Sequence, residues 1–334
     1  MTVFSHLPIV GKLVEWVWET IITIKLLKRV ILEESPDLIN LHWLFHPVAN
    51  GVAIGSKIPI VSTPWGSDLL VPEYQGRGTK SLFRLFHRFA VKNVIRNSEF
   101  FCCDAPHMKD SLIDMGASES QIEIIYFGTD VEFFSPKLRD TDFKHRLGFP
   151  DSSVLVLSNR QLAEVYDIPT LFYAFSKAFR LDVNLRLVIA GGGPLREFLE
   201  NLAIDLSIEK YVQFTGRLSD ADFAIATASA DIYVSTSPTD GGIASSVAEA
   251  MACEVPVIIT RFGDNEKWVK EETAGLLFDS GDVEELIECL IKLASNPELR
   301  REVGKRARKI ILIENNSEIE FLKIIDLYEK ASNS

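Results

Sequence analysis

The amino-acid sequence predicts an α/β protein built from two doubly wound domains. Its 334 residues are more than one small core needs and suit two domains. Short apolar runs rich in β-branched residues alternate with helical segments, which is typical of parallel sheets covered by helices on both faces. This alternation occurs twice, on either side of a polar stretch at 134–142 with the composition of a linker. We expect a cleft between the domains, where the strand ends face each other.

In the first half, a helical stretch at 11–34 comes before the first strand. The expected strands are short, apolar and bounded by turn residues, and they read DLINLHW, IPIVSTPW, SEFFCCDA and IEIIYFG. Helices are expected at 79–97 and in HMKDSLIDMG, which ends at Gly116. The uncharged run 38–56 is long enough to span a membrane. Its two histidines, two asparagines and proline favour a buried strand followed by a helix instead.

The second half repeats this order of strands and helices. Its expected strands read SVLVLSN, NLRLVIA, YVQFTG, DIYVSTS and VPVIIT. The helices IPTLFYAFSKAF and PLREFLENLAIDL lie between them, the second with proline at its start. The final segment, IEFLKIIDLYEKA, is expected to form a helix that crosses back to the first domain. The predicted boundaries are therefore 1–136 and 137–317 for the two domains and 318–334 for the returning helix.

Composition excludes several classes of protein. The net charge is −12; it is about −1 up to residue 150 (16 Lys and Arg against 17 Asp and Glu) and about −11 beyond it. Because neither half is basic, no nucleic-acid partner is expected. The cysteines at 102, 103, 253 and 289 form no metal-binding spacing, which indicates buried, reduced thiols. The N-terminus lacks the basic-then-apolar pattern of a signal peptide, so a cytoplasmic location is expected.

Three features with chemistry suited to anions follow predicted strands of the second half. Arg160 comes directly after SVLVLSN, the glycines Gly191, Gly192 and Gly193 come after LRLVIA, and PTDGGIASSVAEAMA comes after DIYVSTS. Ligands of doubly wound sheets bind beyond the carboxyl ends of the strands. The arginine suits a diphosphate, although an ion pair with a local carboxylate would use the same geometry. The glycines alternatively form only a tight connection between strand and helix.

The stretch after DIYVSTS combines a glycine pair with the start of a helix. Gly241 and Gly242 allow the backbone to approach a ligand closely, and the helix is expected to begin near Ser245. Free N–H groups and the positive end of the helix dipole suit a phosphate there, beside Ser245 and Ser246. Glu249, one turn into the helix, could accept hydrogen bonds from a vicinal diol such as a ribose. The alternative is a capping box of Ser246 and Glu249, in which the carboxylate only returns to the first amide of the helix.

Two features of the first half suit the acceptor side of a cleft. His42 and His46, in LHWLFHP, follow a predicted strand and could carry protons or contact a substrate; buried, hydrogen-bonded histidines are the alternative. In the helix 80–96, basic residues recur every four positions and most aromatic residues fall on the opposite arc. Such a helix suits an anionic membrane surface or an anionic acceptor. The alternative is a surface helix whose aromatic side belongs to the core.

Beyond these patterns, the chain resembles the retaining GT-B glycosyltransferases of family 4. The second half carries most of the resemblance, in IAGGGPLREFLENLA, VQFTGRL, SSVAEAMACEVPVI and AGLLFDSGDVEELIECL. FGTDVEFFSP, HMKDSLIDMG and STPWGSDL extend it, so that it covers residues 35–330. The resemblance implies a GT-B fold whose second domain holds a nucleotide-sugar donor and whose first domain holds the acceptor.

The resemblance also implies roles for individual residues. Glu249 matches the second acidic residue of the family's E-x7-E motif, which holds the nucleotide ribose. Arg160 matches the arginine that neutralises the donor diphosphate and assists departure of the nucleotide. The donor sugar would be attacked from the side of the leaving group, so that its anomeric configuration is kept. No metal and no other cofactor is implied, because side-chain cations and helix N-termini supply the positive charge.

Several positions depart from the family pattern. The first glutamate of E-x7-E falls at Gly241, and the nearest acid is Asp240, which could contact the donor sugar. Val165 replaces the usual lysine after the arginine. Trp65 stands where the family has histidine, and with Asp68 it is an acceptor-side candidate. Because the chain opens with helix-like sequence rather than a strand and glycine-rich loop, the first strands of the N-terminal domain are expected to be missing.

The predicted function is transfer of a sugar, with retention, from a UDP- or GDP-sugar to a lipid-linked or polysaccharide acceptor. Peripheral attachment to the inner face of the cell membrane through helix 80–96 is consistent with the sequence. Two alternatives stay open: a nucleotide-sugar-binding protein that has lost turnover, and a GT-B sugar-nucleotide epimerase. Release of nucleotide from a donor separates the first alternative from a transferase. Conversion of the donor without any acceptor identifies the second.

Overall fold

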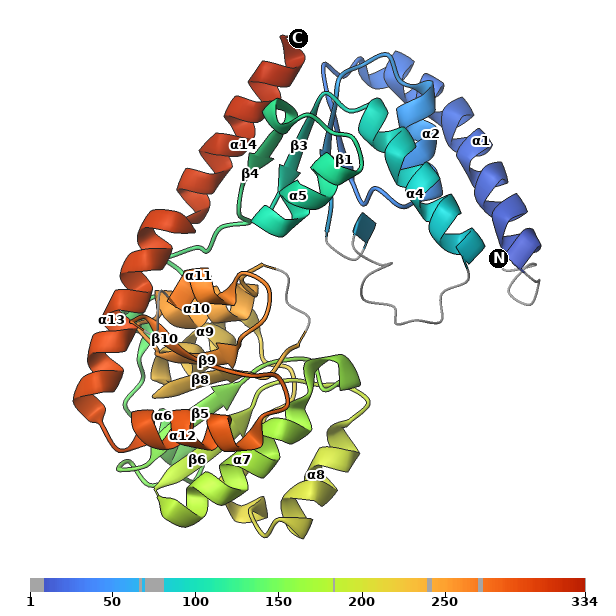
Figure 1. Cartoon of the computed structure of the whole chain (residues 1–334). Coiled ribbons are helices and arrows are strands. Elements are labelled where there is room, and N and C mark those ends of the chain that lie inside the picture. The colour runs from blue at the N-terminus through green and yellow to red at the C-terminus, as the bar shows by residue number, and fades with distance from the viewer. Residues whose placement is uncertain are drawn as a thin grey trace. The chain divides into compact units, whose positions relative to one another are not determined.

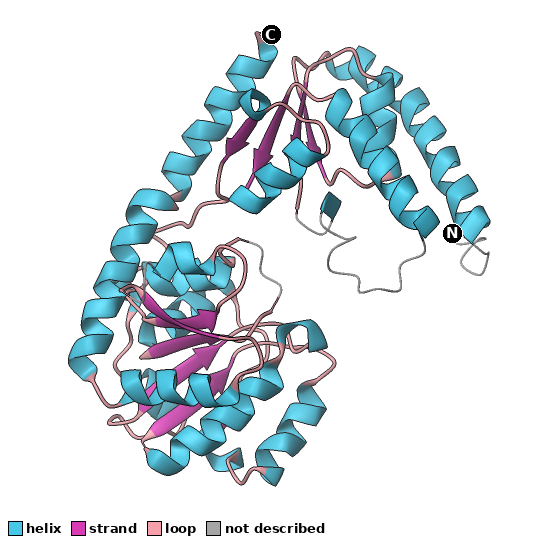
Figure 2. Cartoon of the chain, viewed as in Figure 1, coloured by secondary structure: helices cyan, strands magenta, loops and turns pink. Residues whose placement is uncertain are grey.

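The structure, a computed structural model, describes residues 9–65, 68–69, 81–182, 184–238, 242–269 and 273–333, without the side chains of 9–13 and 81–84. The chain divides into two compact units. Unit 1 comprises Met1–Tyr126 and Glu320–Ser334, and unit 2 comprises Phe127–Ile319. Each unit contains a parallel sheet with helices packed against it (Figures 1 and 2). The predicted α/β class is therefore confirmed.

The sheet of unit 1 has its described strands in the order β1-β2-β3-β4, all parallel. They are β1 (Ile39–His42), β2 (Ile60–Thr63), β3 (Phe100–Cys103) and β4 (Ile122–Ile124). Successive side chains of a strand point to opposite faces. Accordingly, Phe101 and Cys103 join the core on one face and Cys102 joins a smaller core on the other. Apolar packing therefore covers both faces of this sheet.

Helices supply the cover on each face of the first sheet. They are α1 (Ile9–Glu34), α2 (Pro47–Gly55), α4 (Ser81–Arg96), α5 (Pro106–Asp114) and, from Glu320 onward, α14 (Ser317–Ser332). A short 3-10 turn, Glu119–Gln121, comes before β4. α1 packs so closely on α2 that a Cβ on Gly51 would lie 2.6 Å from the Cβ of Thr23. On the other face, α14 contributes Leu327 and Ala331 to the smaller core.

Two predictions from composition are confirmed in the described residues. The uncharged run 38–56 forms β1 and α2, and no described helix is long and apolar enough to cross a membrane. The four cysteines are free and buried. Burial raises the pKa of Cys102, Cys103 and Cys253 to about 12, so these thiols stay protonated at neutral pH.

Unit 2 has its described strands in the order β10-β9-β8-β5-β6-β7, again all parallel. They are β5 (Val154–Ser158), β6 (Leu185–Ile189), β7 (Val212–Phe214), β8 (Ile232–Ser235), β9 (Val257–Thr260) and β10 (Gly275–Phe278). From β5 the chain adds β6 and then β7 on one side. It then returns to place β8 on the other side of β5, followed by β9 and β10. This reversal of strand order is the point at which doubly wound sheets bind ligands.

The helices of unit 2 are α6 (Phe143–Arg146), α7 (Ile168–Leu181), α8 (Arg196–Asp205), α9 (Asp220–Ser229), α10 (Ser245–Ala252), α11 (Asn265–Val269), α12 (Val283–Ala294) and α13 (Pro297–Glu314). Short 3-10 turns occupy Pro136–Leu138, Glu164–Tyr166 and Glu209–Tyr211. The predicted proline start of α8 is wrong, because Leu195 is the N-cap and Pro194 precedes it. β10 and α9 were not predicted.

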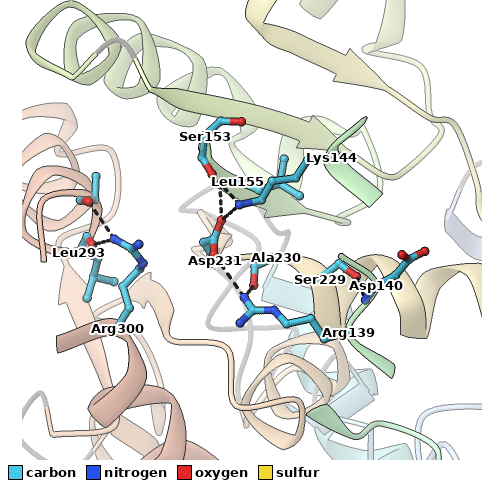
Figure 3. A network of polar contacts seen from close by, with 11 residues as sticks. Arg139, Asp140, Lys144, Ser153, Leu155, Ser229, Ala230, Asp231, Leu293 and Arg300 are labelled. Atoms are coloured by element: carbon cyan, nitrogen blue, oxygen red, sulfur yellow. Dashed lines mark hydrogen bonds and ion pairs between the residues drawn. The ribbon is translucent and has the colours of Figure 1, made fainter. Parts of the chain in front are cut away.

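The segment predicted to be a linker, 134–142, is instead fixed to the second sheet (Figure 3). Arg139 Nη2 donates to the carbonyl oxygen of Ala230 at 3.1 Å and to Asp231 Oδ1 at 3.2 Å. The other carboxylate oxygen of Asp231 lies 2.7 Å from Lys144 Nζ. These contacts lie where the chain enters β8, so one carboxylate ties the segment to the amino-terminal edge of the sheet.

Candidate active site

A cavity of about 680 Å³ lies in unit 2 beyond the carboxyl ends of β5, β6 and β7. Its lining residues come from the turns after these strands and from the start of α9: Asn159, Gln161, Ala190, Gly191, Gly192, Gly193, Arg217, Leu218, Asp220 and Phe223. The volume is in the range of sites for small molecules. The predicted glycine turn is therefore part of this cavity. The contribution of the turn after β7, including Arg217 and Asp220, was not predicted, because no charge pattern singles it out.

Within the glycine turn, two of the three glycines are required by the packing of the protein itself. A Cβ on Gly191 would lie 2.5 Å from the carbonyl oxygen of Arg160, and a Cβ on Gly193 would lie 2.4 Å from that of Leu162. Gly192 differs, because its Cβ position has no described atom within 4 Å. The tight-connection alternative thus accounts for Gly191 and Gly193, and only Gly192 leaves open space beside the cavity.

The guanidinium of Arg160 is held from two sides. Its Nη1 donates to Ser246 Oγ at 3.3 Å, and the guanidinium carbon lies 4.5 Å from the centroid of the Tyr166 ring. The hydroxyl of Tyr233 lies 2.8 Å from Ser246 Oγ and donates to Asn159 Oδ1. These contacts join the end of β5, the strand β8 and the start of α10, at the reversal of strand order. Tyr233 was not predicted, because an aromatic residue in an apolar strand indicates only core.

Helix α10 begins at Ser245, as predicted, but without a side-chain cap. Its N-cap is Ala244, which makes no side-chain cap hydrogen bond. Ser246 lies inside the helix, with its hydroxyl accepting from Arg160. The capping box of Ser246 and Glu249 is therefore wrong. The first turn keeps N–H groups and the positive end of the helix dipole, which suit an anion.

Glu249 carries a strongly perturbed carboxyl group. Burial, and then the negative charge of Asp220, raise its pKa to about 7. Within the described part of the chain, this carboxylate accepts no hydrogen bond. Asp220 also lines the cavity, so the charge that acts on Glu249 belongs to a residue of the cavity wall. A partly desolvated carboxylate that accepts no hydrogen bond from the described residues is an acceptor available to the hydroxyl groups of a ligand.

Some predicted residues lie outside the described part of the chain. Asp240 and Gly241 are among them. Gly242, the next described residue, is half-buried. The predicted sugar contact of Asp240 stays a prediction.

In unit 1, His42 and His46 are both exposed, so the alternative of buried histidines is wrong. His42 ends β1; its Nδ1 accepts from Trp65 Nε1 at 3.1 Å, and its Nε2 lies 2.9 Å from the side-chain amide of Asn40. His46 is the N-cap of α2, where its Nδ1 accepts from the amide of Val48 at 3.2 Å. His42 is therefore fixed by neighbouring side chains, whereas His46 has a structural role at the start of a helix.

Trp65 and Asp68 lie at the carboxyl-terminal edge of the same sheet. Trp65 follows β2 and is 48% exposed. Asp68 is 1% exposed, and its carboxylate accepts from the amides of Leu44 at 2.5 Å and Trp65 at 2.8 Å. Burial raises the pKa of Asp68. Asp68 therefore holds backbone in place from inside the protein, and Trp65 faces solvent.

The basic helix predicted at 80–96 is α4, and its surface is less polar than expected. Arg88 and Arg96 are exposed and Lys92 is half-buried. Leu85 is 68% exposed and Phe89 is 70% exposed. The alternative that the aromatic side belongs to the core is therefore wrong for Phe89. Apolar and basic side chains share the exposed face of this helix.

Comparison with known proteins identifies the family. Residues 140–310 match the family Glycosyl transferases group 1, and residues 7–133 match Glycosyltransferase Family 4. The first match alone covers more than half of the chain. The chain belongs to the group 1 glycosyl transferases. It is a glycosyltransferase of the hexosyltransferase type, so the predicted family and class of enzyme are confirmed.

Relatives of this glycosyltransferase act on different substrates. The N-acetyl-alpha-D-glucosaminyl L-malate synthase of Bacillus anthracis is 25% identical over 305 residues, which are 90% of this chain and 75% of that protein. A GDP-mannose-dependent mannosyltransferase of Corynebacterium glutamicum, acting on a monoacylated phosphatidylinositol monomannoside, is 30% identical over 210 residues. That match covers 60% of this chain and 54% of the relative.

Solved structures confirm the GT-B fold of this glycosyltransferase. The structure of Anabaena HepE in complex with UDP has a TM-score of 0.79 at 18% identity, over 92% of this chain and 82% of that chain. A sucrose-phosphate synthase from Thermosynechococcus elongatus has a TM-score of 0.77 at 20% identity, over 92% of this chain and 76% of that one. At these identities the likeness shows the fold.

Proposed function

We propose that this glycosyltransferase moves a sugar, with retention of configuration, from a UDP- or GDP-sugar to a lipid-linked or polysaccharide acceptor. The observation that carries the proposal is the cluster at the strand-order reversal, where Arg160, held by Ser246, lies beside the cavity and the uncapped start of α10. HepE was solved with UDP, and the Corynebacterium relative uses GDP-mannose and a phosphatidylinositol mannoside. Both bases and a lipid-linked acceptor are therefore represented among similar proteins.

The diphosphate of the donor would lie between the Arg160 guanidinium and the first amides of α10. Ser246 and Tyr166 restrain the guanidinium, so little reorganisation is needed when negative charge develops on the departing nucleotide. Such charge compensation requires no divalent metal. Full activity in the presence of EDTA would support this, and activity restored by Mg²⁺ after EDTA treatment would contradict it.

Glu249 would accept hydrogen bonds from the two ribose hydroxyls of the nucleotide. Its carboxyl group is half-buried and accepts no hydrogen bond from the described residues, and a ribose would supply such donors. The sugar would be attacked from the face that the nucleotide leaves, with Asp240 as a sugar contact and His42, His46 and Trp65 toward the acceptor. NMR of the product reports the anomeric configuration, and an inverted product would overturn the retaining mechanism.

Nucleotide binding is the first property to measure, by thermal unfolding with UDP, GDP or ADP. At an excess of about 100 times the dissociation constant, binding should add roughly 2.7 kcal/mol to stability. We expect one nucleotide to raise the unfolding temperature, and Glu249→Ala to lose the rise. The control is Glu288→Ala, at an exposed position of α12, which should keep it. Persistence of the rise in Glu249→Ala would remove the ribose assignment, and no rise in the wild type would remove the donor site.

A membrane surface is the further partner proposed for this function. On α4, the exposed Leu85 and Phe89 accompany Arg88, Lys92 and Arg96. Apolar side chains that enter the interface, together with cations at the level of the headgroups, fit an anionic lipid surface. This would bring the enzyme to a lipid-linked acceptor, and binding to anionic vesicles tests it.

A further inference from the structure

Two tryptophans at one edge of the first sheet are exposed although the backbone amide of each is hydrogen-bonded. Trp43 follows β1 and is 42% exposed, and Trp65 follows β2 and is 48% exposed. β1 and β2 are parallel neighbours, with His42 paired to Thr63, so both loops leave the sheet at the same edge. Tryptophan is highly buried on average in folded proteins, so two exposed indoles at one edge of a sheet form an unusually large aromatic surface.

The backbone of Trp43 is strained. Its φ is +70°, in the left-handed region that bulky residues avoid and that costs about 1–3 kcal/mol. The conformation is enforced on both sides of the residue. The amide of Trp43 donates to the carbonyl oxygen of Thr63 at 3.2 Å, and the amide of the fully buried Leu44 donates to Asp68. Strain of this kind, maintained by surrounding contacts, is concentrated at functional sites.

One buried carboxylate holds both loops. Asp68 Oδ2 accepts from the amide of Leu44, next to Trp43, and Asp68 Oδ1 accepts from the amide of Trp65. The carbonyl oxygen of Asp68 lies 2.7 Å from Nε2 of the buried His87. Loss of either amide contact would leave a buried polar group unpaired, so the two loops are coupled through a single side chain.

The indole of Trp65 is further fixed by His42. Its Nε1 donates to His42 Nδ1, and His42 Nε2 lies 2.9 Å from the side-chain amide of Asn40. The rings of His42 and Trp65 lie with centroids 5.7 Å apart and planes tilted by 46°. The edge of the indole is thus tied to the protein, and polar groups of His42 and Asn40 stand beside an exposed aromatic surface.

We infer that Trp43 and Trp65 form an aromatic subsite that stacks against a pyranose ring of the acceptor, and that Asp68 is the positioning residue that holds the backbone of the two loops carrying these indoles. A pyranose presents C–H groups on a face and hydroxyls around its rim. The indole faces suit the C–H groups of the sugar. The His42 imidazole and the Asn40 amide, beside Trp65, suit its hydroxyls. An acyl chain would instead require a larger continuous apolar surface. The inference rests on the proposed function, in which unit 1 receives the acceptor.

Saturation-transfer NMR tests the subsite with three probes: the methyl α-glycosides of glucose, mannose and N-acetylglucosamine. We expect ring hydrogens of at least one probe to be saturated by the wild-type protein. The signal should fall about tenfold or more in Trp43→Ala and in Trp65→Ala, as expected when a stacking contact is removed. Trp18→Ala, at an exposed position of α1, is the matched control and should keep it.

The Asp68→Asn variant separates positioning from folding. An amide cannot accept both backbone hydrogen bonds, so glycoside binding should weaken about tenfold. The stabilisation by UDP or GDP, whose proposed site lies in unit 2, should be unchanged. Glycoside binding equal to wild type in Asp68→Asn would overturn the positioning role.

The outcomes also separate this inference from the proposed function. No saturation of any glycoside, or saturation that survives in both tryptophan variants, would overturn the aromatic subsite even if nucleotides stabilise the protein. Saturation lost in both variants, without stabilisation by any nucleotide, would support a sugar subsite and count against the proposed transferase site. Competition of UDP or GDP for the glycoside signal would overturn the assignment to the acceptor.

Discussion

At the scale of single residues, the site in unit 2 depends on side chains whose roles are set by burial. Glu249 was predicted from its place in a motif, but a sequence pattern carries no information on desolvation. The capping-box alternative failed because Ala244, not Ser246, is the residue before the helix. Tyr233 and Asn159 could not be predicted, since their contacts join segments that are distant in sequence.

The Glu249 carboxyl makes stability depend on pH. Its pKa is about 7 in the folded protein, against an ordinary value of 4.5, so the folded state binds more protons between these values. The free energy of unfolding therefore falls as pH rises from 4.5 to 7, by up to about 3 kcal/mol. Urea unfolding at pH 5 and pH 8 should show this fall reduced in Glu249→Gln and unchanged in Glu288→Gln. An equal fall in all three proteins would contradict the assignment.

At the scale of elements, the strands and helices around the site follow closely from the sequence. Apolar β-branched runs became β5, β6, β8 and β9, because a strand covered on both faces has to be apolar throughout. α9 was not predicted because its sequence, DADFAIATAS, is rich in alanine and does not separate into clear apolar and polar faces. β10 was not predicted because four apolar residues, GLLF, are too few for the spacing of hydrophobic residues to distinguish a strand from a helix.

The glycine turn after β6 supplies a matched pair of variants. Gly193→Ala would place a Cβ 2.4 Å from the carbonyl oxygen of Leu162, and the three nearest atoms are all backbone atoms of Leu162, which cannot turn aside as a side chain can. We expect a loss of about 1–3 kcal/mol, the usual cost of overpacking. Gly192→Ala enters open space and should change stability by less than about 0.5 kcal/mol. Chemical denaturation measures both, and equal losses would show that the clash is relieved by movement of the turn.

At the scale of the whole molecule, the net negative charge opposes the proposed contact with an anionic membrane. The chain carries a net charge of −12, which repels an anionic surface. Any attraction must therefore come from a local face such as that of α4, where Leu85 and Phe89 add apolar contact. The family and fold were predictable at this scale because they depend on long patterns of strands, helices and motifs. The preference for a particular sugar, base or acceptor could not be predicted, because it depends on the shape of the site.

Vesicle cosedimentation tests this contact. We expect binding to vesicles of phosphatidylglycerol, little binding to phosphatidylcholine alone, and weakening at high salt. The double variant Lys92→Glu/Arg96→Glu should reduce binding to phosphatidylglycerol about tenfold or more, since each cation near such a surface contributes about 1 kcal/mol. Arg29→Glu/Lys28→Glu on α1 is a control of equal charge change. Equal loss in both double variants would mean that overall charge, rather than α4, governs binding.

The burial of every cysteine has a practical consequence for following how this enzyme moves. Thiols that stay protonated and inside the core react slowly with maleimides or nitroxide reagents. A single cysteine introduced at an exposed position outside the proposed diphosphate site, such as Glu197, would therefore be labelled selectively in the otherwise native chain. A fluorophore or spin label at the start of α8, close to the glycine turn, would then report arrival of the donor in real time, without prior removal of the natural cysteines.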